Sequence, residues 1–96
     1  MEKKFKIDIL TPTEKFFSVE GGMIVARTCN GEIGIMSGHL PLVAAIATGP
    51  MKIFADGEWL TVLLSEGFMM VNRDRTVVLV DDAKWPQEIG ATTKEI

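Results

Sequence analysis

The chain has 96 residues, of which 47% are hydrophobic and 24% are charged, and its formal net charge is -3 at pH 7. This size and composition predict one globular domain with a single modest core and exclude a disordered chain. The sequence has no basic excess that could hold a phosphate backbone, so we expect no nucleic-acid partner.

Alternation of side-chain types predicts the first two strands. Residues 5–9 alternate between apolar and charged residues, which is the pattern of a strand with one buried side. Residues 14–19 are expected to form a second short strand. Its adjacent aromatic residues, Phe16 and Phe17, would point to opposite faces. One of them is therefore expected in the core, and the other is a candidate for contact with a partner.

A hairpin is expected next. Residues 23–28 and 32–36 have strand-like composition and flank Asn30-Gly31. This dipeptide favours a two-residue type I′ turn, because both central residues need positive φ.

The segment NGEIGIMSGHLPL contains the only histidine and three of the nine glycines of the chain. Gly34 and Gly38 are expected to mark a bulge or a close approach of the backbone, and Pro41 is expected to end strand pairing because it lacks an N–H. Turn chemistry alone favours a hairpin followed by a second turn. The alternative is a rigid, exposed loop that holds Glu32 and His39 in place for a partner.

The following segments complete an all-β pattern. Further strands are predicted at 41–47, 51–55, 58–65, 68–72 and 76–80. Asp56-Gly57 forms the clearest hairpin turn of the sequence. Short strands between glycine-containing turns, without an amphipathic helix, predict an antiparallel sandwich or barrel.

The last part of the sequence changes in character. The Asp-Asp-Ala stretch at 81–83 is expected to begin a helical turn, which the following proline and glycine keep short. We therefore predict that the antiparallel sandwich or barrel occupies residues 1–84 and that a short irregular C-terminal tail occupies residues 85–96. Trp85 in this tail is a candidate for docking against a neighbour.

Candidate residues for catalysis or ligand binding are few. His39 is the only imidazole, and no serine has a nucleophile-elbow context. Glu32 and His39 would supply only two of the three or four ligands that a zinc site needs, and no glycine-rich phosphate loop is present. Cys29 is the only cysteine, and we expect it to be a small buried residue at a strand end. We expect no catalysis, no metal and no cofactor.

Membrane contact is expected only through a complex. The longest apolar run, residues 40–47, contains a proline. No run approaches the ~18 residues that a membrane-spanning helix needs.

Most of the chain resembles one known family. The epsilon subunit of rotary F-type ATP synthases has an N-terminal domain that is similar to three stretches, FKIDILTPTEKFF, TCNGEIGIMSGHLPLVAAIATGPMKI and LLSEGFMMVNRDRTVVLVDDAKWPQEI. The most specific element, NGEIGIMSGHLPLVAAIATG, resembles the family pattern G-E-x-G-(I/L)-x-x-G-H-x-P-L. The resemblance implies a β-sandwich of about ten short strands in two sheets.

The resemblance also implies a role and its contacts. Such subunits are non-catalytic parts of the rotor that join the gamma subunit to the membrane c-ring and couple ion translocation to ATP synthesis. The expected location is the cytoplasmic face of a bacterial plasma membrane, as a peripheral part of the complex. The loop that matches residues 32–42 meets the c-ring in these subunits. The implied contact residues are Glu32, Ile33, Met36, Gly38, His39 and Pro41.

A second, apolar patch is predicted to face gamma. Adjacent large apolar residues on a strand cannot all point inward. We therefore expect contributions from Phe16 or Phe17 and from Met69 or Met70, together with Trp85.

Two further expectations concern the limits of this resemblance. Family members usually continue into a two-helix C-terminal domain that restrains ATP hydrolysis; this domain is expected to be absent here, so inhibition and nucleotide binding are not carried over. The rival function is a free-standing small β-sandwich that binds a peptide or a small ligand. Stable one-to-one binding to gamma is expected only of the rotor subunit.

Overall fold

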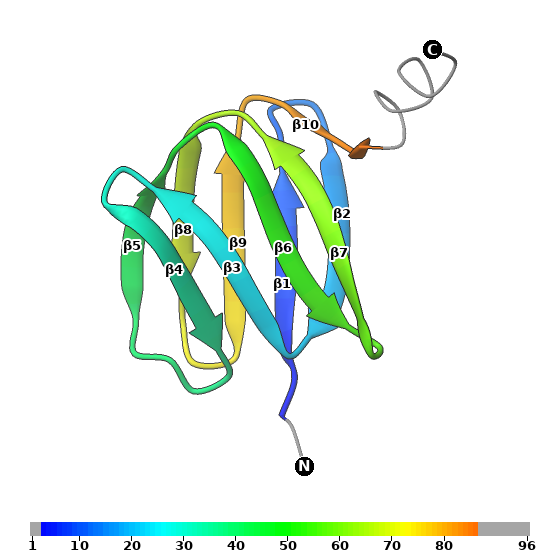
Figure 1. Cartoon of the computed structure of the whole chain (residues 1–96), viewed down its shortest axis with the longest axis vertical. Helices are drawn as coiled ribbons and strands as arrows, with labels where there is room; N and C mark the ends of the chain where they lie inside the picture. Colours follow the sequence, from blue (N-terminus) through cyan, green and yellow to red (C-terminus); the bar gives the residue numbers. More distant parts are fainter. Residues whose placement is uncertain (1–2, 87–96) are drawn as a thin grey trace.

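A computed structural model describes residues 3–86 of the chain. Ten strands follow one another within these residues (Figure 1), and most of them match a predicted strand. Their bounds are β1 Phe5–Leu10, β2 Lys15–Gly21, β3 Met23–Thr28, β4 Gly31–Met36, β5 Leu42–Ile46, β6 Gly49–Ala55, β7 Glu58–Leu64, β8 Gly67–Val71, β9 Arg75–Val80 and β10 Ala83–Lys84.

The strands form two layers that face each other. Hydrogen-bonded neighbours follow the order β10-β7-β6-β3-β5-β8-β9-β1-β2, and β4 pairs with β3. Figure 1 shows β4, β3, β6 and β7 in front of β5, β8, β9, β1 and β2. The first group, with β10, is termed the front sheet, and the second group is termed the back sheet. The predicted β-sandwich is confirmed.

The core lies between the sheets and is built from alternate residues of most strands. This alternation is the period-two pattern that predicted the strands, and it puts one side chain in two into the interior. Burying each large aliphatic side chain contributes roughly 1.5–3 kcal/mol. Isoleucine and valine side chains that are at most 1% exposed are Ile7, Ile9, Ile24, Ile35, Ile53, Val62 and Val78.

Two narrow junctions join the sheets. At the first, a single residue pair, Thr28 of β3 and Ile46 of β5, links the front sheet to the back sheet. At the second, the Gly22 N–H donates to the carbonyl oxygen of Phe54 at 2.8 Å. A Cβ atom on Gly21 would lie 2.9 Å from the same oxygen, so the sheets can approach this closely only because residue 21 is a glycine.

One strand pairing and one segment differ from the predictions. Strand β1 pairs with β9 in parallel, with Ile9 opposite Val78. The predicted helical turn at 81–83 is wrong, because Ala83 begins β10 and pairs with Leu64 of β7. Ala83 is 8% exposed, and the strand pairing satisfies backbone groups at this buried edge.

The two predicted hairpin turns differ from each other. Asp56 and Gly57 have φ of +53° and +78°, as the predicted type I′ turn requires. At the other hairpin, Gly31 has φ of +112°, but Asn30 is not among the described residues with positive φ. The I′ prediction is wrong there, and Gly31 already pairs with Thr28 as the first residue of β4. The Thr28 hydroxyl donates to the Gly31 carbonyl oxygen at 2.7 Å and so stabilises a different turn.

Candidate interaction surfaces

The loop 37–41 between β4 and β5 is held by hydrogen bonds. Gly38 has φ of +84°, and its N–H donates to the carbonyl oxygen of Arg73 at 2.8 Å. The His39 Nδ1 atom lies 2.7 Å from the Leu40 carbonyl oxygen, which can only accept, so Nδ1 donates. Leu40 itself is 71% exposed. The second turn that turn chemistry predicts is therefore present, and it presents an apolar side chain to solvent.

Strand β4 separates residues that the sequence analysis placed in one loop. Glu32 lies next to the β3–β4 turn, whereas Met36 lies at the other end of the strand, opposite Met23. Four residue steps along a strand span roughly 13 Å, and His39 lies beyond Met36. The segment 32–42 is therefore a strand followed by a loop, and Glu32 and His39 do not form one cluster.

The remaining residues predicted to contact a c-ring differ in exposure. Met36 is 57% exposed and Pro41 is exposed, whereas Ile33 is half-buried and packs against the core. Of the two alternatives predicted for Gly34, a bulge or a close approach, the bulge is excluded because the pairing of β3 with β4 runs without a shift. A Cβ on Gly34 would lie 3.0 Å from the Met23 side chain, so this glycine marks a close approach instead.

An aromatic cluster joins β2 to the residue that follows β10. The ring centre of Trp85 lies 5.3 Å from that of Phe16 and 4.9 Å from that of Phe17. The pairing of β1 with β2 shifts between Ile9 and Leu10, so the two phenylalanines lie at a bulge and do not alternate. The expectation that they point to opposite faces is wrong, since both pack against Trp85.

Met69 and Met70 of β8 point to opposite sides of the back sheet. Met69 is 0% exposed and belongs to the core, whereas Met70 is 36% exposed. Met69 therefore offers no surface to a partner. Met70 stays a candidate for the predicted contact with gamma.

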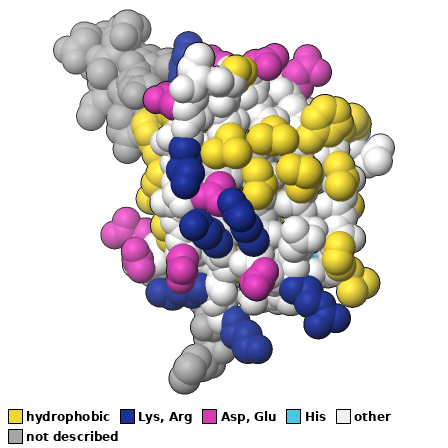
Figure 2. Space-filling view, turned by 180° about the vertical axis from the view of Figure 1, so that it is seen from behind, with side chains coloured by type: hydrophobic (Ala, Val, Ile, Leu, Met, Phe, Trp, Pro, Cys, Tyr) yellow, Lys and Arg dark blue, Asp and Glu magenta, His cyan; other side chains and the backbone are white. Residues whose placement is uncertain are grey.

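The back sheet carries apolar residues on its outer surface as well as on its inner one. The outward residues of β5, β8 and β9 lie opposite one another across these strands, and Figure 2 shows hydrophobic side chains gathered on this side of the molecule. Val43 is 68% exposed and Phe68 is 57% exposed. This surface is termed the apolar face, and its residues are Val43, Ala45, Phe68, Met70, Val77 and Leu79.

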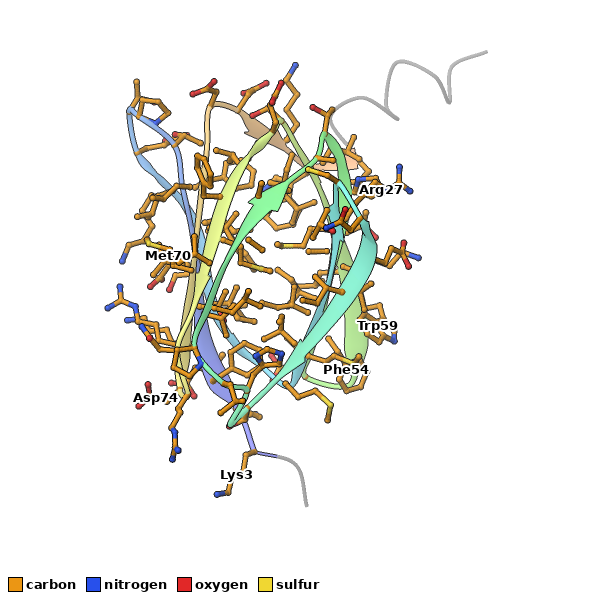
Figure 3. All side chains as sticks on the ribbon, turned by 90° about the vertical axis from the view of Figure 1, so that its left-hand side faces the viewer. Lys3, Arg27, Phe54, Trp59, Met70 and Asp74 are labelled. Carbon is orange, nitrogen blue, oxygen red and sulfur yellow. The ribbon has the colours of Figure 1, made fainter. Side chains whose placement is uncertain are left out.

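Only Met70 of the apolar face was predicted from the sequence. In Figure 3 it lies on the opposite side of the sandwich from Phe54 and Trp59. The signal that could have found the face is the continuous apolar run in the strands around 43 and 77. A strand without polar alternation is typical of one that is covered on both sides.

An open cleft of about 850 Å³ adjoins the apolar face at one end of the sandwich. Three residues, Ala45, Phe68 and Leu79, belong to both surfaces. The carboxylate residues Glu66 and Asp81 also line the cleft. Cys29 is a lining residue as well, and it is exposed. The expectation that Cys29 is buried is wrong, because it follows the last residue of β3 and lies in the turn.

A buried carboxylate lies beside the apolar face. The Asp8 side chain is 0% exposed. Its Oδ1 accepts a hydrogen bond from the Ser18 hydroxyl at 2.6 Å, and its Oδ2 accepts from Arg75 Nη2 at 2.9 Å and Nε at 3.2 Å. The bond from Ser18, the bonds from Arg75 and the charge of Lys6 lower the pKa of Asp8, and burial opposes them.

The part of the chain that the structure describes contains neither a cluster of metal ligands nor a membrane-spanning helix. Within residues 3–86, no three His, Cys, Asp or Glu side chains gather as a metal site would require. Nor does that part of the chain contain a helix of the length and apolarity that crossing a membrane demands.

The sequence matches a known family over nearly all described residues. Residues 4–86 match the family "ATP synthase, Delta/Epsilon chain, beta-sandwich domain". The ATP synthase epsilon chain of Ruminiclostridium cellulolyticum is 39% identical over 85 residues, which are 88% of this chain and 63% of the relative. The ATP synthase epsilon chain of Caldanaerobacter subterraneus subsp. tengcongensis is 41% identical over 90 residues, which are 93% of this chain and 65% of the relative. The chain thus spans just under two thirds of the length of these relatives.

Solved structures share the fold. A chain in the Euglena gracilis mitochondrial ATP synthase structure, described as OSCP/F1/c-ring, has a TM-score of 0.81 at 20% identity, over 96% of this chain and 62% of that chain. A chain in the central stalk/c-ring structure of the Tetrahymena thermophila mitochondrial ATP synthase has a TM-score of 0.76 at 19% identity, over 94% of this chain and 72% of that chain. At these identities the likeness concerns the fold alone.

Proposed function

Since this chain belongs to the family of ATP synthase Delta/Epsilon chains with a beta-sandwich domain, we propose that it is a non-catalytic central-stalk subunit of an F-type ATP synthase. It links the gamma subunit to the membrane c-ring and couples ion translocation to ATP synthesis. As a part of that complex it lies at the periphery of the membrane, on the cytoplasmic face of a bacterial plasma membrane.

The extent of the family match carries this proposal. The match begins before β1 and ends after β10, so it includes all ten strands and the connections between them. The relatives named above are ATP synthase epsilon chains of bacteria and are 39% and 41% identical to this chain. This agreement supports a rotor subunit more strongly than a free-standing binding module.

The mechanical demand on such a subunit is stiffness. A part that transmits torque between two partners must resist shear, and a close-packed interior has low compressibility. Strand β6 pairs with β7 along its whole length, from Gly49 to Ala55. Continuous backbone pairing and the aliphatic core provide this resistance without any chemical step.

We assign the two partners to different surfaces. Gamma covers the apolar face, because a contiguous exposed apolar surface is typical of a protein interface. The c-ring contacts the loop 37–41, in which Gly38, His39 and Pro41 lie, together with Met36. Glu32 lies at the far end of β4 from Met36, so a c-ring contact that includes Glu32 would extend along the whole strand.

The test measures binding to each partner separately. The purified chain and gamma from the same organism should form a one-to-one complex, detected by sedimentation or calorimetry. The detergent-solubilised c-ring, with gamma bound, should then retain the chain. Absence of any complex with gamma would contradict the proposal and would favour the free-standing module.

Single variants locate the contact with the c-ring. Because Glu32 and His39 lie at different places on β4 and the loop, Glu32→Ala and His39→Ala are compared separately. Glu58→Ala, an exposed carboxylate change on β7, is the matched control for Glu32→Ala. We expect His39→Ala to weaken retention on the c-ring and to leave gamma binding unchanged. Retention equal to that of the parent would remove the loop from the proposed interface.

A further inference from the structure

The Asp8, Ser18 and Arg75 group lies beside the apolar face. Asp8 is outward on β1 and lies opposite Val77 of β9, in the row that continues to Met70 of β8. A partner that covers the apolar face would therefore also reach this group.

A contribution to stability is a weak explanation for a buried ion pair between Asp8 and Arg75. Replacing a buried ion pair with apolar residues of similar size is often neutral or stabilising. On the β9 side the next positions of the row are the apolar residues Val77 and Met70, so an apolar residue at position 8 would extend the apolar face as far as Ser18 of β2. The structure instead keeps a buried carboxylate, which receives three hydrogen bonds from Ser18 and Arg75.

Asp8 fixes the orientation of the Arg75 guanidinium. Nε and Nη2 both donate to the same oxygen of Asp8, so one edge of the guanidinium is occupied. The terminal edge carries one N–H of Nη1 and the second N–H of Nη2, which point in parallel, and the remaining N–H of Nη1 lies on the side of Cδ. Among residues 3–86, Asp8 is the one side chain to which this guanidinium donates. The Arg75 side chain is 53% exposed, so the unoccupied edge is accessible.

The unoccupied edge suits a second carboxylate. Its parallel N–H groups match the two oxygens of a carboxylate in a bidentate pair. A guanidinium that is already oriented also loses less conformational freedom on binding than a free one. The adjacent Lys6 lies opposite Glu20 across β1 and β2 and forms no ion pair among residues 3–86, whereas Asp8 holds Arg75 in a defined orientation.

We propose that Arg75, oriented by Asp8 and Ser18, is a specificity residue at the border of the apolar face and receives an acidic side chain of the partner in a bidentate pair. The inference rests on the proposed function, in which this partner is gamma. It predicts that the contacting segment of gamma presents an Asp or Glu next to an apolar surface. The apolar contact supplies area, and the fixed guanidinium selects the orientation in which the acidic side chain meets it.

The test compares the affinity of folded variants for purified gamma by calorimetry. Arg75→Gln removes the donor edge, and Arg75→Lys keeps the charge but cannot form the bidentate pair. The double variant Asp8→Asn, Arg75→Gln leaves no unpaired buried charge, so it should stay folded. Arg27→Gln is the matched control, because Arg27 is an exposed arginine on β3 of the front sheet. Thermal unfolding followed by circular dichroism verifies each fold.

We expect all three changes at Arg75 to weaken gamma binding by about tenfold or more, and Arg27→Gln to bind like the parent. If Arg75→Gln does not fold, the gamma affinity of the double variant tests the inference in its place. Parent-like affinity of the folded double variant overturns the inference and leaves the proposed function intact. A parent chain that does not bind gamma overturns both.

Discussion

The outer surfaces of the two sheets differ in how their apolar residues are arranged. On the back sheet, apolar residues cover three adjacent strands in two rows. On the front sheet, Arg27, Lys52 and Thr61 interrupt the outer surface. A single apolar row crosses the front sheet, and it consists of Met36, Met23, Phe54 and Trp59. A half-solvated sheet needs polar residues on its outer side, so this difference supports the proposal that gamma covers the back sheet rather than the front sheet.

Polar substitutions on the apolar face should reduce gamma binding more than any other change. Phe68→Ser with Leu79→Ser removes two exposed side chains of the apolar face, and each is expected to be a substantial part of the interface with gamma. Affinity for gamma should fall about a hundredfold or more, since large apolar residues at an interface centre dominate binding. Calorimetry measures the loss.

The matched change on the front sheet is Met36→Ser with Trp59→Ser. Both side chains are more than half exposed, at 57% and 51%. This pair should leave gamma binding within a few-fold of the parent. An equal loss of gamma affinity in the two double variants would show that gamma does not prefer the back sheet to the front sheet.

Alanine substitutions at two adjacent residues of β8 test which side chain lies in the core and which lies on the apolar face. Met69→Ala leaves a cavity in the core and should lower the free energy of unfolding by about 2–5 kcal/mol. Met70→Ala, one residue further along β8, should lower it by less than about 1 kcal/mol. Urea denaturation at equilibrium measures both. Similar losses for the two variants would mean that β8 is not oriented as described.

The smallest expected effect concerns the polar border of the apolar face. The pKa of Asp8 is lower in the folded chain than in the unfolded one, so its ionised form stabilises the fold at pH above its ordinary value of about 3.9. This contribution is lost as the pH falls below that value toward the lower folded pKa. The stability difference between the parent and Asp8→Asn should therefore be largest near neutral pH and should shrink in acid.

The control for this pH profile is Asp56→Asn, at the exposed β6–β7 turn. Asn tolerates the positive φ of this position, so the change should have little effect on stability. Urea denaturation from neutral pH to about pH 3 compares the three proteins. A difference between the parent and Asp8→Asn that stays constant over this range would contradict the assigned hydrogen bonds.

Much of the fold could be predicted from local patterns. Period-two alternation located most strands, and Asp56-Gly57 was correctly predicted as a type I′ turn because both residues tolerate positive φ. The parallel pairing of β1 with β9 could not be predicted, since it joins segments that are distant in the sequence. The short strand β10 was missed because Ala83 becomes strand only through its long-range pairing with β7.

The candidate surfaces were harder to predict, for a physical reason. Met69 and Met70 are chemically identical, so only strand register decides which one is buried. Phe16 and Phe17 do not alternate between the two faces of β2, because a bulge interrupts the regular pairing of β1 with β2 at this point. The burial of Asp8 could not be predicted, because a charged residue in an alternating strand normally faces solvent. Its partner Arg75 comes from a distant part of the chain, so the ion pair could not be predicted either.

The parallel pairing of the first strand with the ninth affects how the chain can fold during synthesis. Strand β1 lies between β2 and β9, so its hairpin with β2 can form as soon as both have been made. Its other edge stays unpaired until residues 75–80 are available. Pairings between distant segments slow folding because the intervening loop must close first. The open edge of β1 is thus a site at which the incomplete chain can pair wrongly with another strand.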